Sequence, residues 1–330
     1  MGFDRRWVTV LAAISAGLAV LAFVLAGPAH AARAGSANAG PPHAGPARAD
    51  GFVTFRLPRG GGRGVTPDAA DFAESAPGRA PLLVFLPATG AAPQRYRLFL
   101  ETAHSAGYSV LGLDYPDTGP SLARSCQGDM ACYGEMLANR FDGQDPSRFS
   151  RVRADNAILH RLRGALAYLS THDAAGAWDR YRTASGLRWS DVVLAGHSQG
   201  GSEAAYMAHL RCVRGVLMFS APAESVGGRV PAWLARHSAT PPTRMWALDD
   251  AGDVYAARIG PSWRALGIMA GRPRRLPRGA HGLVTTLELG TPGQAHGRVV
   301  SDRTPLGAAG EPVLQPVWRW MLRQSLDAAT

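Results

Sequence analysis

The feature that most constrains this chain is an alternation of short apolar runs with segments of helical character. Apolar runs with the length of buried strands occur at residues 82–86, 110–113, 192–195, 213–219 and 244–248. Segments that suit helices lie between and after them, at 96–103, 158–169, 199–210, 255–266 and 313–326. This alternation predicts an α/β fold with a mainly parallel central sheet, flanked by helices on both faces. In such a sheet, ligands bind at the carboxyl ends of the strands.

Three other segments are predicted from local composition. Residues 51–58 alternate in polarity and indicate a first strand, and the Gly-rich residues 59–80 indicate a loop. The segment 115–150 is long and polar and indicates an extended loop. Because only residues 221–242 separate the fourth and fifth core strands, the sequence predicts no large cap domain. We expect the 115–150 loop to overlie the edge of the sheet where ligands bind.

The N-terminus has the composition of an export signal. Arg5-Arg6 precede an almost wholly apolar run at residues 8–25, and Ala29-His30-Ala31 forms an A-x-A cleavage site. The predicted organisation is a signal peptide at 1–31, a disordered linker at 32–50 and one domain at 51–330. The predicted location is secreted, or periplasmic or in the cell envelope. An uncleaved anchor is the alternative, since the apolar run reaches the lower length limit of a membrane span.

The basic charge of the chain does not indicate a polyanion partner. The formal net charge is +10, but the chain contains no lysine, and its 35 basic residues are arginines that are mostly scattered singly. Together with the 39 glycines and 24 prolines, this composition is typical of GC-rich codon usage. No Lys/Arg-rich block interleaved with aromatic residues occurs. We therefore expect no nucleic-acid partner and no stable membrane partner after signal cleavage.

The three cysteines fit an exported protein. Cys126 and Cys132 are close enough in sequence to close a small disulfide, whereas Cys212 follows an apolar stretch and is expected to be a buried free thiol. The chain contains neither a C-x-x-C nor an H-E-x-x-H pattern. The sequence therefore predicts no bound metal.

The segment 191–207, DVVLAGHSQGGSEAAYM, carries the strongest functional signal. An apolar strand ends at a serine that is flanked by spaced glycines, and a helix-forming segment follows. Gly196 and Gly200 would let the strand and helix backbones approach, which exposes the Ser198 hydroxyl on a strained turn as a nucleophile. The alternative is that Ser198 only caps the helix.

The residues Gly196-His197-Ser198-Gln199-Gly200-Gly201, between a predicted strand and helix, resemble the nucleophile elbow of the α/β-hydrolase superfamily. The G-H-S-Q-G form is common among its secreted lipases and esterases, and the resemblance in topology covers about residues 52–327. It implies a serine hydrolase with the chain order Ser, then Asp or Glu, then His. It also implies an oxyanion hole that combines the Gln199 N–H with an amide of the loop after 82–86. Where many relatives carry His-Gly, that loop reads Pro-Ala-Thr-Gly-Ala, and Thr89, Gly90 and Ala91 are the candidates for the second donor.

The acid is expected after the strand at 244–248, where three carboxyl groups occur. Asp253 has the offset from the strand that the family favours, and Asp250 is the alternative. Asp249 and Asp250 also suit a solvated turn with side-chain hydrogen bonds to the backbone.

Two histidines, His281 and His296, follow these carboxyl groups and could act as the base. Residues 283–289 read as the last strand because Val, Thr and Leu favour a pleated surface. We favour His296, on the loop after that strand, over His281, and we expect His197 to have a structural role.

The predicted function is a secreted serine hydrolase that cleaves carboxylic esters through an acyl-enzyme intermediate on Ser198. Its substrate would be a small-molecule or polymer ester, and no metal or organic cofactor is required. An acyltransferase or amidase on the same scaffold is an alternative. A non-catalytic exported binding protein with a hydrolase fold is another.

Overall fold

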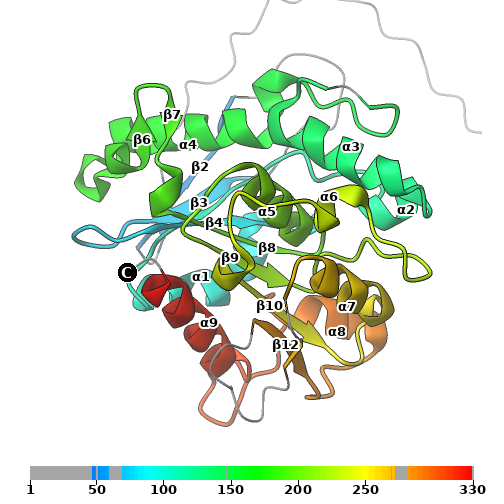
Figure 1. Ribbon diagram of the computed structural model, residues 1–330. Helices are drawn as coiled ribbons and strands as arrows, with labels where there is room; N and C mark the ends of the chain where they lie inside the picture. The colour runs from blue at the N-terminus through cyan, green and yellow to red at the C-terminus, as the bar shows by residue number, and fades with distance from the viewer. Residues whose placement is uncertain are drawn as a thin grey trace, which may run out of the picture. The chain divides into compact units, whose positions relative to one another are not determined.

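Figure 1 shows the computed structural model, which describes residues 47–49, 51–58, 69–145, 147–268, 270–271 and 281–328. The predicted signal peptide and most of the predicted linker lie outside the described residues. Residues 47–49, which we expected in the linker, form a strand that pairs with the next one. Within the described ranges, no helix combines the length and apolar character needed to cross a membrane.

A ten-stranded sheet runs through the described part of the chain. Its strands, in spatial order, are β1 (Ala47–Ala49), β2 (Phe52–Phe55), β3 (Asp71–Glu74), β5 (Ser109–Gly112), β4 (Leu82–Leu86), β8 (Val192–His197), β9 (Gly215–Phe219), β10 (Met245–Asp250), β12 (Gly282–Thr285) and β11 (Ala270–Gly271). All neighbours from β5 to β11 are parallel, whereas β1, β2 and β3 pair antiparallel and β3 pairs antiparallel with β5. The predicted mainly parallel sheet is confirmed.

The central strands are buried on both faces, and their side chains alternate between two hydrophobic cores. In β4, Leu82, Val84 and Leu86 enter one core, while Leu83 and Phe85 enter the other. The described helices that cover the first face are α2 (Leu122–Cys126), α3 (Met130–Asp142), α4 (Ile158–His172), α5 (Gln199–Leu210), α6 (Ala232–Ala235) and α7 (Ala256–Ala265). Those that cover the second face are α1 (Arg97–Ser105), α8 (Pro292–Arg298) and α9 (Gln315–Asp327). This layered arrangement is the predicted one (Figure 1).

Two segments predicted as loops contain regular structure. Within 59–80, β3 forms because Phe72 and Ala73 pack into the cores, and the buried Asp71 accepts a hydrogen bond from Asp114 N–H at 2.9 Å. Two acidic residues in the four-residue strand conceal it in the sequence. The prediction for 115–150 is also wrong, because this segment forms α2 (Leu122–Cys126) and α3.

The ends of these two helices carry ordinary stop and start signals. The side chain of Ser121 caps α2, and that of Asp129 caps α3 by accepting from the backbone N–H of Ala131 and Cys132. Gly143, at φ 74°, ends α3 in a left-handed conformation. In the sequence, the polar exposed residues of α3 hide its buried apolar face, so this segment was predicted as a loop.

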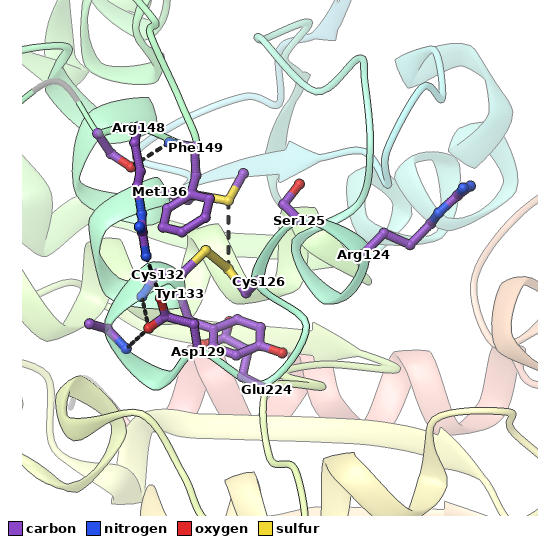
Figure 2. The surroundings of a disulfide bond; sticks show 12 residues. Arg124, Ser125, Cys126, Asp129, Cys132, Tyr133, Met136, Arg148, Phe149 and Glu224 are labelled. Atoms are coloured by element: carbon purple, nitrogen blue, oxygen red, sulfur yellow. Dashed lines mark hydrogen bonds and ion pairs between the residues drawn. A yellow bond between two sulfur atoms is a disulfide. The ribbon is translucent and has the colours of Figure 1, made fainter.

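The disulfide between Cys126 and Cys132 is confirmed, and it joins the end of α2 to the first turn of α3 (Figure 2). The prediction for Cys212 is wrong: this free cysteine is exposed. It lies beyond the last residue of α5, in the turn that leads to β9, rather than on the buried face of the helix.

Candidate active site

Ser198 occupies the turn between β8, which ends at His197, and α5, which begins at Gln199. Its backbone has φ 53° and ψ −118°, a strained conformation for a residue with a side chain. The side chain makes no capping hydrogen bond to α5. The capping alternative therefore does not describe this serine, whose hydroxyl lies 2.8 Å from Nε2 of His296.

The glycines around Ser198 are required by close backbone contacts. A Cβ on Gly196 would lie 2.3 Å from the carbonyl of Gly200, and a Cβ on Gly200 would lie 2.0 Å from the Leu86 carbonyl oxygen. The first contact lets α5 turn back against β8. The second brings the start of α5 against the end of β4, so that the loop after Leu86 lies beside the serine.

His296 connects the serine to a carboxylate. Its Nδ1 lies 2.8 Å from Oδ2 of Asp253, and Nε2 faces Ser198. Because Nδ1 faces a carboxylate, it carries the proton, and Nε2 accepts from the Ser198 hydroxyl. His296 lies in α8 rather than on the expected loop, because Thr291 and Gln294 form a capping box that starts this helix six residues after β12.

The alternative base, His281, lies at the opposite edge of the sheet. It precedes β12, its Nδ1 contacts the carbonyl oxygen of Met245 at 2.9 Å, and its ring stacks on Trp246. Met245 begins β10, whereas Asp253 follows the end of that strand. The two ends of a six-residue strand are about 16 Å apart. His281 is therefore not placed next to Ser198.

The carboxyl groups after β10 have different partners. Asp250 accepts a hydrogen bond from Gly252 N–H at 2.8 Å, as in the predicted turn, but the side chain is buried and not solvated. It is not the carboxyl next to His296. Asp253 accepts from Tyr255 N–H at 2.7 Å and from His296. Asp249 is hydrogen-bonded to Asp253 and accepts from the Ser220 hydroxyl at 3.0 Å.

Burial and neighbouring charges shift the pKa values of Asp253 and Asp249 in opposite directions. Burial favours the neutral form of Asp253, but the hydrogen bond and charge of His296 outweigh this effect and lower the pKa of the carboxyl. Burial, reinforced by the charge of Asp253, raises the pKa of Asp249 to about 9. At neutral pH, Asp249 is therefore protonated and donates its hydrogen bond to the ionised Asp253.

Two backbone amides beside Ser198 are available to a ligand. Gln199 N–H is at the start of α5, where the first turn has no carbonyl partner. In the loop after β4, Ala88, Gly90 and Ala91 donate their N–H groups to Tyr96 Oη, Asp117 O and Ala88 O. Among the described residues, Thr89 N–H has no backbone partner, and the Thr89 hydroxyl donates to Gln199 Oε1 at 2.9 Å. Thr89 is thus better placed than Gly90 or Ala91 as a donor.

A buried chain of polar groups that the sequence did not indicate supports this loop from below. Ala88 N–H donates to Tyr96 Oη at 3.1 Å, and Tyr96 Oη lies 2.9 Å from Nδ1 of His197. Nε2 of His197 lies 2.8 Å from the carbonyl oxygen of His296 and donates to it. Burial, with the nearby charge of His296, lowers the pKa of His197 to about 3, so its ring is neutral. His197 has the structural role expected of it, and Tyr96 shares that role.

A pocket of about 240 Å³ opens beside Ser198. It is lined by Ala88, Thr89, Ser121, Leu122, Ala123, Ser198, Gln199, Ser202, Ala223, Glu224, Tyr255 and His296. Residues 121–123 belong to the segment that we expected to overlie this edge of the sheet. No group of three His, Cys, Asp or Glu side chains that could hold a metal ion occurs within the described ranges.

Comparisons with known proteins give structural matches only. No protein-family model and no curated protein sequence matches the chain. The dienelactone hydrolase of Anabaena variabilis is similar at 14% identity and a TM-score of 0.42, over 84% of this chain and 98% of that one. A hormone-sensitive lipase from a metagenome library is similar at 13% identity and a TM-score of 0.40, over 84% and 86%. An esterase of Thermogutta terrifontis is similar at 14% identity and a TM-score of 0.40, over 78% and 88%.

The fold is assigned from the chain's own topology and local geometry. A mainly parallel sheet carries a strained serine between a central strand and the helix that follows it. In chain order come the serine, then a carboxylate after β10, then a histidine after β12. By this order and by the elbow at Ser198, the chain has the α/β-hydrolase fold.

Proposed function

We propose that the protein is a serine hydrolase that cleaves carboxylic esters through an acyl-enzyme intermediate on Ser198. The observation that carries the proposal is the continuous hydrogen-bonded chain from Ser198 through His296 to Asp253, with 2.8 Å at each step. A serine on a strained elbow, joined to an imidazole and an ionised carboxylate, is the arrangement that activates a hydroxyl group. Export with removal of residues 1–31 is part of the proposal and is supported by the sequence alone.

The first half of the reaction forms the acyl-enzyme. The Ser198 oxygen attacks the ester carbonyl carbon while its proton passes to Nε2 of His296, and Asp253 stabilises the imidazolium that results. The N–H groups of Gln199 and Thr89 donate to the carbonyl oxygen as it becomes negatively charged. His296 then returns the proton to the departing alcohol, and the C–O bond of the ester breaks.

The second half releases the acid. A water molecule gives its proton to His296 and attacks the acyl carbon, and the same two amides stabilise the second tetrahedral intermediate. Ser198 leaves with the proton from His296, which regenerates the free enzyme. Two proton transfers to His296 and two from it balance the cycle.

The experiment compares the hydrolysis of p-nitrophenyl butyrate by the wild-type chain and by Ser198→Ala. We expect a burst of p-nitrophenol with the wild type and a loss of at least about a thousandfold in kcat/KM with the variant. Equal turnover by both folded proteins would contradict the proposal. Added methanol separates hydrolysis from acyl transfer, since a transferase would give mainly methyl butyrate.

A further inference from the structure

The pocket beside Ser198 contains a buried carboxyl group to which the proposed mechanism gives no role. Glu224 lies after β9, is 1% exposed and lines the pocket. It also belongs to the surroundings of the disulfide, together with Tyr133 of α3 (Figure 2). A buried carboxyl group needs hydrogen-bond donors. At a ligand site, those donors come either from the protein or from the bound ligand.

The partners of Glu224 occupy only part of its hydrogen-bonding capacity. Oε2 accepts from Trp233 Nε1 at 2.8 Å, and Trp233 is itself 5% exposed. The hydroxyl of Ser202, one helical turn after Ser198, also forms a hydrogen bond with the same carboxyl. Among the described residues, Oε1 of Glu224 has no hydrogen-bond partner, although it is buried. One acceptor position is therefore unused in a residue that lines the same pocket as the nucleophile.

The charges around Glu224 favour a neutral donor over a cation. Arg258 lies close enough to act on the carboxyl electrostatically, and its guanidinium donates to Ser225 O at 2.9 Å and to Tyr133 Oη at 3.0 Å. Burial raises the pKa of Glu224 to about 7, so the carboxyl is only partly ionised near neutral pH. An ammonium group would lose its hydration beside an existing guanidinium, which a neutral hydroxyl group avoids.

The size of the pocket limits the rest of the substrate. Its volume of about 240 Å³ lies below the roughly 300–1,000 Å³ of sites that enclose drug-sized ligands. Small side chains such as Ala88, Ala123 and Ala223 line it together with polar ones. A short chain that carries one polar group fits this lining better than a long alkyl chain does.

We propose that Glu224 is a specificity-determining residue that accepts a hydrogen bond from a hydroxyl group of the substrate, so that the enzyme prefers short hydroxylated esters. This inference rests on the proposed ester hydrolysis at Ser198. A site built to bond a hydroxyl group rejects the analogue that lacks it, because a buried polar group is then left unpaired.

The experiment uses two pairs of esters matched in heavy-atom number. p-Nitrophenyl 3-hydroxybutyrate is compared with p-nitrophenyl 3-methylbutyrate for the acyl side, and 2-hydroxyethyl butyrate with propyl butyrate for the alcohol side. We expect the wild type to favour the hydroxylated ester of at least one pair by about tenfold or more in kcat/KM. Equal kcat/KM within both pairs would overturn the proposal without the need for any variant.

Two variants of Glu224 test its role directly. Glu224→Gln keeps an oxygen for Trp233 Nε1 and replaces the free acceptor by an amide donor, and Glu224→Met removes the polar group. We expect both to reduce the hydroxyl preference to about onefold to threefold. An unchanged preference in a folded variant would overturn the proposal. So would a wild-type preference for 2-(dimethylammonio)ethyl butyrate over the hydroxyethyl ester, since that would assign a cationic donor.

Glu203→Gln is the matched control. Glu203 is also a fully buried carboxyl, but it does not line the pocket, and its Oε1 lies 3.7 Å from Arg140. We expect Glu203→Gln to keep the wild-type hydroxyl preference. If it lost that preference as Glu224→Gln does, the effect would come from buried carboxyl groups in general, and the proposal would be overturned.

Fluorophosphonate labelling separates this inference from the proposed function. We expect the wild type to form the Ser198 adduct, whatever the ester preference of the Glu224 variants. Labelling together with an unchanged ester preference would contradict the role of Glu224 alone. Absence of labelling in the wild type would contradict the hydrolase proposal itself.

Discussion

At the scale of single residues, Asp249 and Asp253 show how position along one turn separates two identical groups. Asp253 is ionised beside His296, whereas Asp249 is protonated and hydrogen-bonded to Asp253. The sequence favoured Asp253 from its offset after the strand and His296 from its place after β12, and the structure brings both to Ser198. The sequence could not indicate the protonation of Asp249 or the hydrogen bonds by which Tyr96 supports the loop after β4, because both depend on contacts across the folded chain.

Because Asp253 is ionised and Asp249 is protonated, substitution by asparagine should reduce activity strongly at Asp253 and only slightly at Asp249. Asp253→Asn removes the charge that holds and stabilises the His296 imidazolium, so we expect kcat/KM for p-nitrophenyl butyrate to fall by about 10⁴. Asp249→Asn replaces a protonated acid by an amide that can donate to Asp253 and accept from Ser220, so we expect a loss of less than about tenfold. Steady-state kinetics at pH 7 measure both effects. A larger loss from Asp249→Asn than from Asp253→Asn would contradict these assignments.

At the scale of elements, the sequence predicted those that follow one regular pattern. The predicted elements include the parallel strands β4, β5, β8, β9, β10 and β12 and the helices α1, α4, α5, α7 and α9, because apolar residues mark buried strands or one helical face. The predictions missed β3, α2 and α3, in which charged and polar residues interrupt that pattern. They also placed His296 on a loop, because the capping signal at Thr291 precedes a helix of only seven residues.

The disulfide at the junction of α2 and α3 predicts a measurable effect on the pocket. It anchors α2, which begins with Leu122 and Ala123 of the pocket wall. We expect the double variant Cys126→Ser/Cys132→Ser to raise KM about threefold to tenfold while kcat changes less. The reason is that α2 becomes more mobile at the pocket, whereas the turn that carries Ser198 keeps its conformation. The free energy of unfolding should fall by about 2 kcal/mol, as for a short closed loop.

The control for the disulfide is Cys212→Ser, which removes an exposed, unpaired thiol. It should leave both KM and the free energy of unfolding close to those of the wild type. A double variant with wild-type KM would show that α2 holds its position without the disulfide.

At the scale of the whole molecule, buried carboxyl groups should make stability depend on pH. Burial raises the pKa of Asp71, Asp117 and Glu224 to about 7 and that of Glu203 to about 8. The folded chain therefore binds more protons than the unfolded chain between about pH 4 and these values, and stability is lost as pH rises through this range. His197 acts in the opposite direction, but only below its ordinary pKa of 6.5.

The window from pH 7 to 8 is dominated by the carboxyl groups, since His197 is neutral there in the folded state and mostly neutral in the unfolded state. We expect the free energy of unfolding in urea to fall across this window. Glu203→Gln should reduce the slope by at most about 1.4 kcal/mol per pH unit, which corresponds to one proton. A wild-type stability that rises with pH over this window would contradict the assignment of protonated buried carboxyl groups.

The most direct test of the central claim is the intact mass of residues 32–330 after incubation with a fluorophosphonate. We predict a single adduct on the wild type and on His281→Ala, and none on Ser198→Ala. His296→Ala should react at least about a thousandfold more slowly than the wild type, because the serine loses its base. No adduct on a folded wild-type sample, or an adduct that forms as fast on His296→Ala, would contradict the claim that Ser198 is a nucleophile activated by His296.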